Sequence, residues 1–190
     1  ASLGASFKGH INGTEINGEF SQMGYSIQLN LKQGEEKLNR PQNPTKPYPY
    51  KTEEVTFTNT TDKAMLAGTI CYPVNYQKGK TPVVLMVTGS GLENRDEEVF
   101  DHKPFLVIAD YLARNGVATL RYDDRTFGAS KGGDVKNATT KDFARDAEAG
   151  IAYLKSTKKF GKVGVLGHSE GGSIAFMLGA KNKVDFIISM

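Results

Sequence analysis

Cysteine, histidine and long apolar runs are all scarce in this sequence of 190 residues. Cys71 is the only cysteine, so neither an intrachain disulfide nor a thiolate metal site can form. Because Cys71 lies in a strand-like run, we expect it in the core. No apolar run approaches the roughly 20 residues that a membrane-spanning helix needs, so we expect no membrane span. We assign no cofactor and no metal ligand to the chain.

A strong charge of one sign is also absent. The chain has 24 Lys and Arg residues against 21 Asp and Glu residues, a net charge of +3 with neutral histidine. The basic residues lie among acidic neighbours and do not cluster with aromatic residues, so we expect no nucleic-acid-binding surface. The first six residues lack the basic start and apolar centre of a signal peptide, and the sequence alone indicates no compartment.

Residues 1–39 contain short segments in which apolar and polar side chains alternate. The dipeptides Asn12-Gly13 and Met23-Gly24 separate three such segments, and Asn-Gly favours the positive φ of a hairpin turn. We therefore predict a three-stranded meander. A sheet of three short strands has only marginal stability alone. We therefore expect that it either packs against the rest of the chain or lacks strands that preceded it in the sequence.

Residues 40–51 contain four prolines, which favour an extended and stiff path. We interpret this segment as a linker because it lies between two strand-rich regions. A ligand for proline-binding domains is the alternative.

From residue 52 to residue 190 the pattern is that of an α/β domain. Strands alternate with segments of helical period, which predicts a doubly wound, mostly parallel sheet. The expected elements are an antiparallel pair at 53–58 and 64–73, a buried strand at 82–88, a helix at 104–115, a strand at 117–122, a helix from Thr139 or Thr140, a strand at 162–166, a helix after residue 169 and a last strand at 184–189.

The strongest functional signal lies between the strand at 162–166 and the helix after it. The intervening turn reads Gly167-His-Ser-Glu-Gly171, with Ser169 at its centre. Glycines on both sides permit a sharp strand-to-helix turn that exposes the serine hydroxyl, which is typical of a nucleophile elbow. We predict that Ser169 is a catalytic nucleophile. The alternative is a serine that caps a helix in a tight turn.

A second stretch, Gly128-Ala-Ser-Lys-Gly132, fits the same pattern. It has neither a strand directly before it nor an apolar helix after it, and an elbow requires both. We therefore expect Ser130 to be a loop residue.

The glycine-rich stretch Gly89-Ser-Gly91 follows the buried strand at 82–88. Backbone N–H groups in such a turn can face a carbonyl oxygen and form an oxyanion hole. We predict that the N–H groups of Ser90 and Glu170 are its two donors, because a helix that begins after Ser169 directs free N–H groups to the same place. A plain tight turn is the alternative for residues 89–91.

Six segments resemble those of the bacterial α/β-hydrolases of the serine-aminopeptidase-like and esterase group, and the likeness extends over nearly the whole chain from Phe7. Thr126 is a departure, since this group usually has glycine after the Asp-Asp-Arg motif. The segments are Leu38-Asn-Arg-Pro-Gln, Pro47-Tyr-Pro-Tyr, Gly89-Ser-Gly-Leu-Glu-Asn-Arg-Asp-Glu, Asp101-His-Lys-Pro-Phe, Leu120-Arg-Tyr-Asp-Asp-Arg and Gly167-His-Ser-Glu-Gly-Gly.

The resemblance implies an α/β-hydrolase fold and a serine hydrolase that attacks carboxylic esters through an acyl-enzyme. Its partner would be a small-molecule ester or acyl substrate. Residues 1–39 would be the remnant of a β-rich N-terminal domain. The resemblance favours an exported, periplasmic bacterial protein, with a cytoplasmic one as the alternative.

A catalytic base is not evident. In this group the acid and the histidine follow the nucleophile, but only 21 residues follow Ser169 and none is histidine. His168 should point away from the serine hydroxyl, His102 should cap or pack at a helix start, and His10 should lie on the surface.

We therefore expect an internal piece of a longer hydrolase, with the acid and the histidine beyond Met190. The last strand would then leave an apolar edge through which the chain self-associates. The alternative function is a non-catalytic binding or structural module on the same scaffold.

Overall fold

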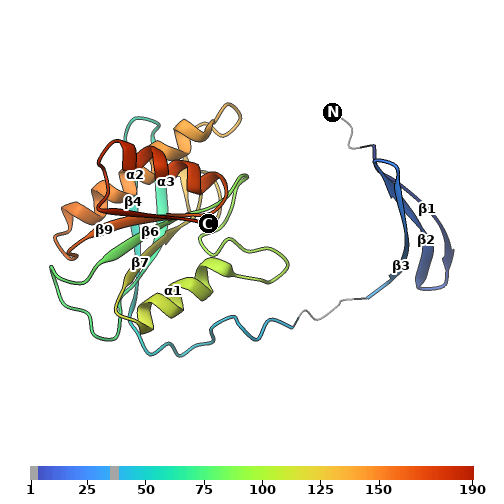
Figure 1. Cartoon of the computed structure of the whole chain (residues 1–190), viewed down its shortest axis with the longest axis horizontal. Helices are drawn as coiled ribbons and strands as arrows, with labels where there is room; N and C mark the ends of the chain where they lie inside the picture. Colours follow the sequence, from blue (N-terminus) through green and yellow to red (C-terminus); the bar gives the residue numbers. More distant parts are fainter. Residues whose placement is uncertain (1–3, 35–38) are drawn as a thin grey trace. The chain divides into compact units, whose positions relative to one another are not determined.

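The computed structural model describes residues 4–34 and 39–190, and the chain divides into two compact units, residues 1–39 and 40–190 (Figure 1). In the first unit, β1 (Ser6–Asn12), β2 (Glu15–Gln22) and β3 (Tyr25–Lys32) form an antiparallel sheet in that order. The register aligns Phe7 with Phe20 and Phe20 with Ile27, so apolar side chains share one face. The predicted meander is confirmed.

The second unit contains a mixed sheet, with strand order β10-β9-β6-β7-β5-β4. The pairs β9–β10, β6–β9 and β6–β7 are parallel, whereas β4–β5 and β5–β7 are antiparallel. The predicted doubly wound, mostly parallel sheet is confirmed. Its strands are β4 (Thr52–Asn59), β5 (Ala64–Cys71), β6 (Val83–Val87), β7 (Ala118–Tyr122), β9 (Val163–Gly167) and β10 (Phe186–Ser189), and the short β8 (Lys131–Gly132) pairs with β5.

Helices cover both faces of this sheet. In Figure 1, α2 (Thr140–Ser156) and α3 (Glu170–Ala180) lie over one face and α1 (Pro104–Arg114) lies over the other. The residues of β6 alternate between the two layers. Leu85 packs in the cluster that includes residues of α2 and α3, while Met86 packs with residues of α1. The all-apolar β6 thus follows from burial on both faces.

Local sequence signals mark where the helices begin and end. Pro104 occupies the first turn of α1, and Gly116, with φ of 88°, follows its end. Thr139 and Asp142 form a capping box at the start of α2. Within residues 4–34 and 39–190, no helix has the length and apolarity needed to cross a membrane.

The proline-rich segment, residues 40–51, is part of the second unit and packs against its helix α1. The rings of Tyr48 and Tyr50 stack with centroids 5.2 Å apart, and Tyr50 joins the buried cluster beside α1. The Asn43 side-chain amide donates to the carbonyl of Asp101 (2.6 Å). Proline content indicates an extended path but not these contacts, and the domain boundaries drawn from the sequence stay a prediction.

Candidate active site

Ser169 lies in the turn between β9 and α3, with φ of 53° and ψ of −115°. Few residues other than glycine adopt positive φ, and such strain persists only where the surroundings enforce it. Here the N–H of Gly171 donates to the carbonyl of His168 (2.8 Å), and the N–H of Gly172 donates to that of Ser169 (3.0 Å). The serine is exposed at the end of a buried strand. This is the geometry of a nucleophile elbow.

The two glycines of the turn are required by close backbone approach. A Cβ at Gly167 would lie 1.9 Å from the carbonyl oxygen of Gly171. A Cβ at Gly171 would lie 2.2 Å from the carbonyl oxygen of Val87, at the end of β6. Any side chain at either position would therefore push the elbow out of the sheet.

The loop after β6 meets the elbow. A Cβ at Gly89 would lie only 3.4 Å from the Cβ of Ser169. The N–H of Gly89 donates to Glu97 Oε1 (2.8 Å), whereas the N–H groups of Ser90 and Glu170 have no acceptor among the described residues. Both of these N–H groups remain available to a ligand.

Ser90 and Ser169 border one cavity of about 320 Å³, lined also by Gly89, Glu93, Glu97, Val99, His102, Pro104 and His168. Glu170 is the first residue of α3, and its carboxylate accepts a hydrogen bond from the Thr140 hydroxyl (2.6 Å). Its side chain is therefore held by α2, which leaves its backbone N–H as the group that can face an oxyanion.

The histidines occupy three different environments. His168 Nδ1 lies 2.9 Å from Glu97 Oε1. His102 does not cap α1 with its side chain, because Lys103 is the N-cap; its Nδ1 lies 2.8 Å from the amide nitrogen of Gln42. His10 is exposed on β1. In the described parts of the chain, no side chain hydrogen-bonds to the hydroxyl of Ser169.

Two carboxylates at the end of β7 brace the loop after β6. Asp123 accepts hydrogen bonds from Arg95, with Nη2 at 2.8 Å and Nε at 3.0 Å. Burial alone would raise the pKa of Asp123, but the hydrogen bonds from Arg95 and from backbone N–H groups outweigh it and hold this pKa below its usual range. Asp124 accepts from the N–H of Glu93 (2.8 Å) and from the hydroxyl of Thr88. Burial raises the pKa of Asp124 to about 7.

Sequence reasoning assigned no role to Glu97, Asp123 or Asp124. A signal for the two aspartates was present, since carboxylates directly after a parallel strand lie at the edge of the sheet where sites form. Nothing local indicated that Glu97 would fold back onto Gly89.

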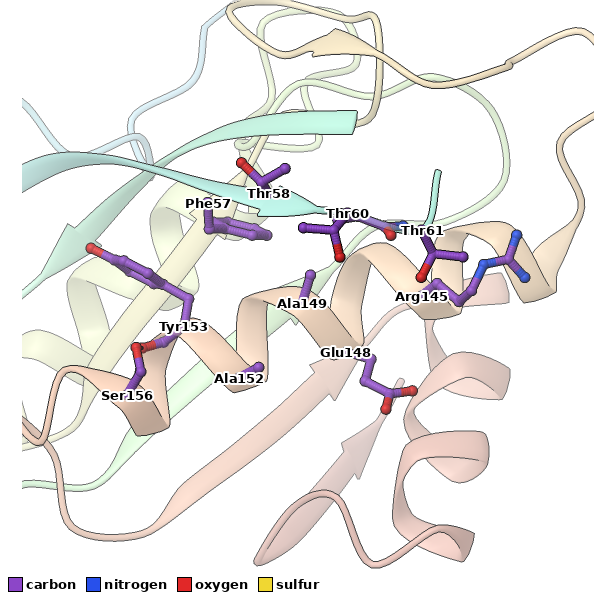
Figure 2. A pocket seen from close by; sticks show the side chains of 11 residues that line it. Phe57, Thr58, Thr60, Thr61, Arg145, Glu148, Ala149, Ala152, Tyr153 and Ser156 are labelled. Atoms are coloured by element: carbon purple, nitrogen blue, oxygen red, sulfur yellow. The ribbon is translucent and has the colours of Figure 1, made fainter. Parts of the chain in front are cut away.

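A larger cavity of about 550 Å³ lies between β4 and α2, away from the elbow (Figure 2). Small and hydroxyl-bearing side chains such as Thr60, Ala149 and Ser156 line it, and Arg145 at one end is paired with Asp62. Its lining contains no histidine or cysteine. The candidate active site is therefore the smaller cavity beside Ser169.

Comparison with known proteins agrees with this architecture. The model of the family described as serine aminopeptidase, S33, matches residues 103–189. Esterase EstD of Thermotoga maritima is 33% identical over 123 residues, which are 65% of this chain and 29% of that protein. The structure of the Pyrococcus furiosus esterase Pf2001 matches 68% of this chain and 47% of its own, with 26% identity and a TM-score of 0.53.

A further structure, the α/β-hydrolase GrgF from Penicillium, matches 73% of this chain and 45% of its own, with a TM-score of 0.60. Its 21% identity supports the fold alone. The chain thus spans less than half the length of these relatives. Its sheet order and elbow define an α/β-hydrolase. The partial matches to esterases and to the serine aminopeptidase family agree with the resemblance noted in the sequence.

Proposed function

We propose that this protein is a serine hydrolase of carboxylic esters in which Ser169 forms the acyl-enzyme. The observation that carries the proposal is the strained turn at Ser169, which presents an exposed hydroxyl beside the loop of Ser90. The related proteins named as esterases support carboxylic esters as the substrates.

In the proposed reaction, the Ser169 oxygen attacks the ester carbonyl while a general base takes the hydroxyl proton. The negative charge on the resulting tetrahedral oxygen is stabilised by the N–H groups of Ser90 and Glu170. The free N–H groups and the dipole at the start of α3 add to this stabilisation. Loss of one such donor typically costs about 3 kcal/mol of transition-state stabilisation. The base then gives this proton to the leaving oxygen, so that the alcohol departs, and water hydrolyses the acyl-enzyme to regenerate the serine.

The general base is assigned to none of the three histidines. His168 is engaged by Glu97, and His102 is engaged by Gln42. A serine hydroxyl without a base is a weak nucleophile, because the triad acts as a unit. We expect the 190-residue chain alone to hydrolyse p-nitrophenyl acetate with an acceleration of at most about 10³ over water. High turnover that is lost in His102→Ala would instead identify His102 as the base.

Fluorophosphonate labelling of the full-length protein tests the nucleophile. We expect one adduct, on Ser169, that disappears in Ser169→Ala. Ser130→Ala is the matched control, since Ser130 fits the same sequence pattern. Its hydroxyl donates to the carbonyl of Asp123 (2.7 Å) and accepts from the N–H of Ala67 (2.9 Å), so it is already engaged. An adduct on Ser130 would refute the assignment, and a folded protein that never labels would favour a non-catalytic module.

A further inference from the structure

The carboxylate of Glu97 joins the two loops of the candidate active site. Its Oε1 atom accepts a hydrogen bond from the N–H of Gly89 (2.8 Å) and lies 2.9 Å from Nδ1 of His168. Glu97 is only 6% exposed, although it lies in a loop. A buried carboxylate is retained at a cost unless its oxygens are satisfied, so this contact constrains the local structure.

The position of that oxygen is informative. Gly89 directly precedes Ser90, the proposed oxyanion donor, and His168 directly precedes Ser169, the proposed nucleophile. A Cβ built at Gly89 would lie 3.5 Å from Glu97 Oε1 and 3.5 Å from His168 Nδ1, which shows how closely the three segments meet. Oε1 of Glu97 therefore contacts both the residue before Ser90 and the residue before Ser169.

Glu97 is itself held in place by its loop. It has φ of 53°, and its N–H donates to the carbonyl of Asn94 (2.9 Å). The side-chain oxygen of Asn94 accepts from the N–H groups of Asp96 (2.9 Å) and Glu98 (3.3 Å). Arg95, between them, is fixed to Asp123 at the end of β7. A strained backbone held by several contacts is typical of functional sites.

From this geometry we infer that Glu97 is a positioning residue that sets the distance between the oxyanion donor on Ser90 and the nucleophile Ser169. It acts through Gly89 and His168 and takes no part in the chemical steps. The inference rests on the proposed function. An oxyanion donor must lie within about 2.7–3.1 Å of the oxyanion, and a displacement near 1 Å can cost on the order of 10² in rate. The loss should appear in kcat and leave KM nearly unchanged.

Three variants of the full-length protein test this role. Glu97→Gln keeps a side-chain oxygen that can accept from the N–H of Gly89 and lie beside Nδ1 of His168, so we expect kcat within about fivefold of wild type. Glu97→Asp keeps the charge but is one methylene shorter, and we expect kcat to fall by on the order of 10² with KM changed less than about threefold. Glu148→Asp is the matched control, because Glu148 pairs with Lys181 and Lys183 away from this loop, and its kcat should stay at the wild-type value.

A boronic acid inhibitor, which forms a tetrahedral adduct with the serine, supplies a second readout. Its affinity should fall in Glu97→Asp in proportion to kcat/KM, since both depend on the oxyanion donors. A role in folding alone would lower thermal stability without this correlation. Both substitutions are conservative, so the comparison does not depend on a variant that fails to fold.

Other results would overturn the inference. A loss in Glu97→Gln as large as that in Glu97→Asp would show that kcat needs the charge of Glu97, so that the position of its oxygen does not by itself explain the effect. A rise in KM at constant kcat would show that Glu97 contacts substrate. Activity within about twofold of wild type in Glu97→Asp would show that the contacts of Glu97 with Gly89 and His168 are dispensable. If the wild-type protein is not labelled on Ser169, the proposed function fails first, and that result is distinct from these.

Discussion

Alternating strands occur in both units of the chain, but they bury their apolar faces in only one. In β4 of the second unit, Val55 and Phe57 are 8% and 5% exposed. In the first unit, Ile11, Tyr25 and Ile27 are 78%, 81% and 57% exposed. The period-two pattern thus determines which face a side chain takes, while burial depends on a second layer of structure.

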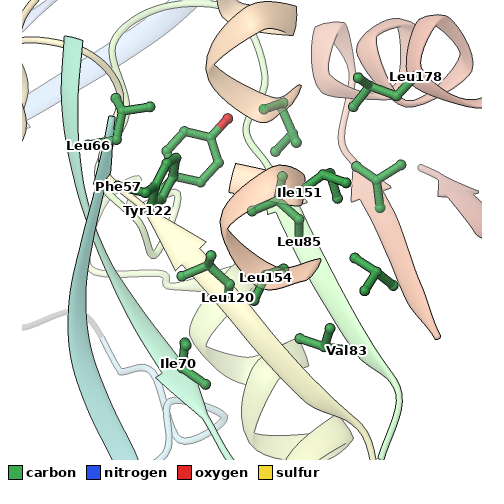
Figure 3. Packing of buried hydrophobic residues seen from close by; sticks show 14 of the residues in the cluster. Phe57, Leu66, Ile70, Val83, Leu85, Leu120, Tyr122, Ile151, Leu154 and Leu178 are labelled. Atoms are coloured by element: carbon green, nitrogen blue, oxygen red, sulfur yellow. The ribbon is translucent and has the colours of Figure 1, made fainter. Parts of the chain in front are cut away.

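The second unit has that layer on both faces of its sheet. Figure 3 shows Leu85 of β6 and Leu120 of β7 beside Ile151 and Leu154 of α2, and all four are at most 2% exposed. The first unit has three strands and, among its described residues, no helix. A sheet of this size without a second layer in its own unit contributes little stability of its own.

The largest expected effect is loss of a core side chain in the second unit. Leu85→Ala removes a fully buried side chain, and we expect a loss of about 3 kcal/mol in the free energy of unfolding, because transfer and cavity terms add. The matched change in the first unit, Ile27→Ala, should cost less than about 0.5 kcal/mol. Urea denaturation followed by circular dichroism measures both. A comparable loss in the two variants would show that the apolar face of the first unit is covered.

The next effect is a pH dependence confined to the second unit. Burial raises the pKa of Asp124 from 3.8 to about 7, so the folded state holds a proton that the unfolded state releases. Stability contributed by protonated Asp124 is therefore full below about pH 4 and is lost as the pH rises to about 7.

Between pH 5 and pH 8 the loss of this contribution to the free energy of unfolding amounts to roughly 2 to 3 kcal/mol, at 1.36 kcal/mol per pKa unit. Over that range the free energy of unfolding of Asp124→Asn should change less than that of the wild type, by this amount. Urea titrations of the two proteins at several pH values measure the difference. Parallel stability profiles would show that Asp124 is already ionised in the folded protein at pH 5.

A smaller effect concerns self-association of the 190-residue chain, which we expect at tens of micromolar, roughly the range of weak protein contacts. Two surfaces are candidates, the edge strand β10, where Ile188 is 39% exposed, and the broader apolar face that contains Ile27. A lysine on either should weaken association, by about tenfold in Kd for Ile27→Lys and by less for Ile188→Lys. Sedimentation velocity measures both, and a clean monomer would contradict the expectation.

Periodicity and local chemistry predicted the fold well because they act over a few residues. The spacing of Phe143, Ala147, Ile151 and Leu154 identified the face of α2, and the same four residues pack in or against the main core cluster. Glycines flanking Ser169 predicted the sharp turn between β9 and α3, because such a turn has strict steric requirements. Signals of this kind depend on the backbone, so they can be read in one sequence.

The contacts between distant residues that hold the candidate site could not be predicted from local sequence patterns. Glu97 contacts His168 across 71 positions, and Asp124 contacts Thr88 across 36. Such contacts depend on how loops fold over the sheet edge and leave no periodic signal. The packing of Tyr50 beside α1 was missed for the same reason, since proline content indicates an extended chain but not the surface on which it lies.

The smallest expected effect concerns non-glycine residues at positive φ, which occur in both units. In the first unit, Gly13 and Gly24 have φ of 61° and 82°, and Met23 has φ of 51°. In the second unit, the exposed Thr126 has φ of 63° in the loop after β7, where the resemblance to known hydrolases expects glycine. A branched side chain in this region costs about 1–2 kcal/mol, whereas glycine adds about 0.5–1 kcal/mol of backbone entropy to the cost of folding.

We therefore expect Thr126→Gly to stabilise the second unit by about 0.5 to 1 kcal/mol, or about 2 °C in Tm. Thr126→Ala is the control, because it shortens the side chain but keeps the Cβ, and it should give no gain. Differential scanning calorimetry separates these outcomes, and equal melting temperatures for the Gly and Ala variants would show that Thr126 is not strained.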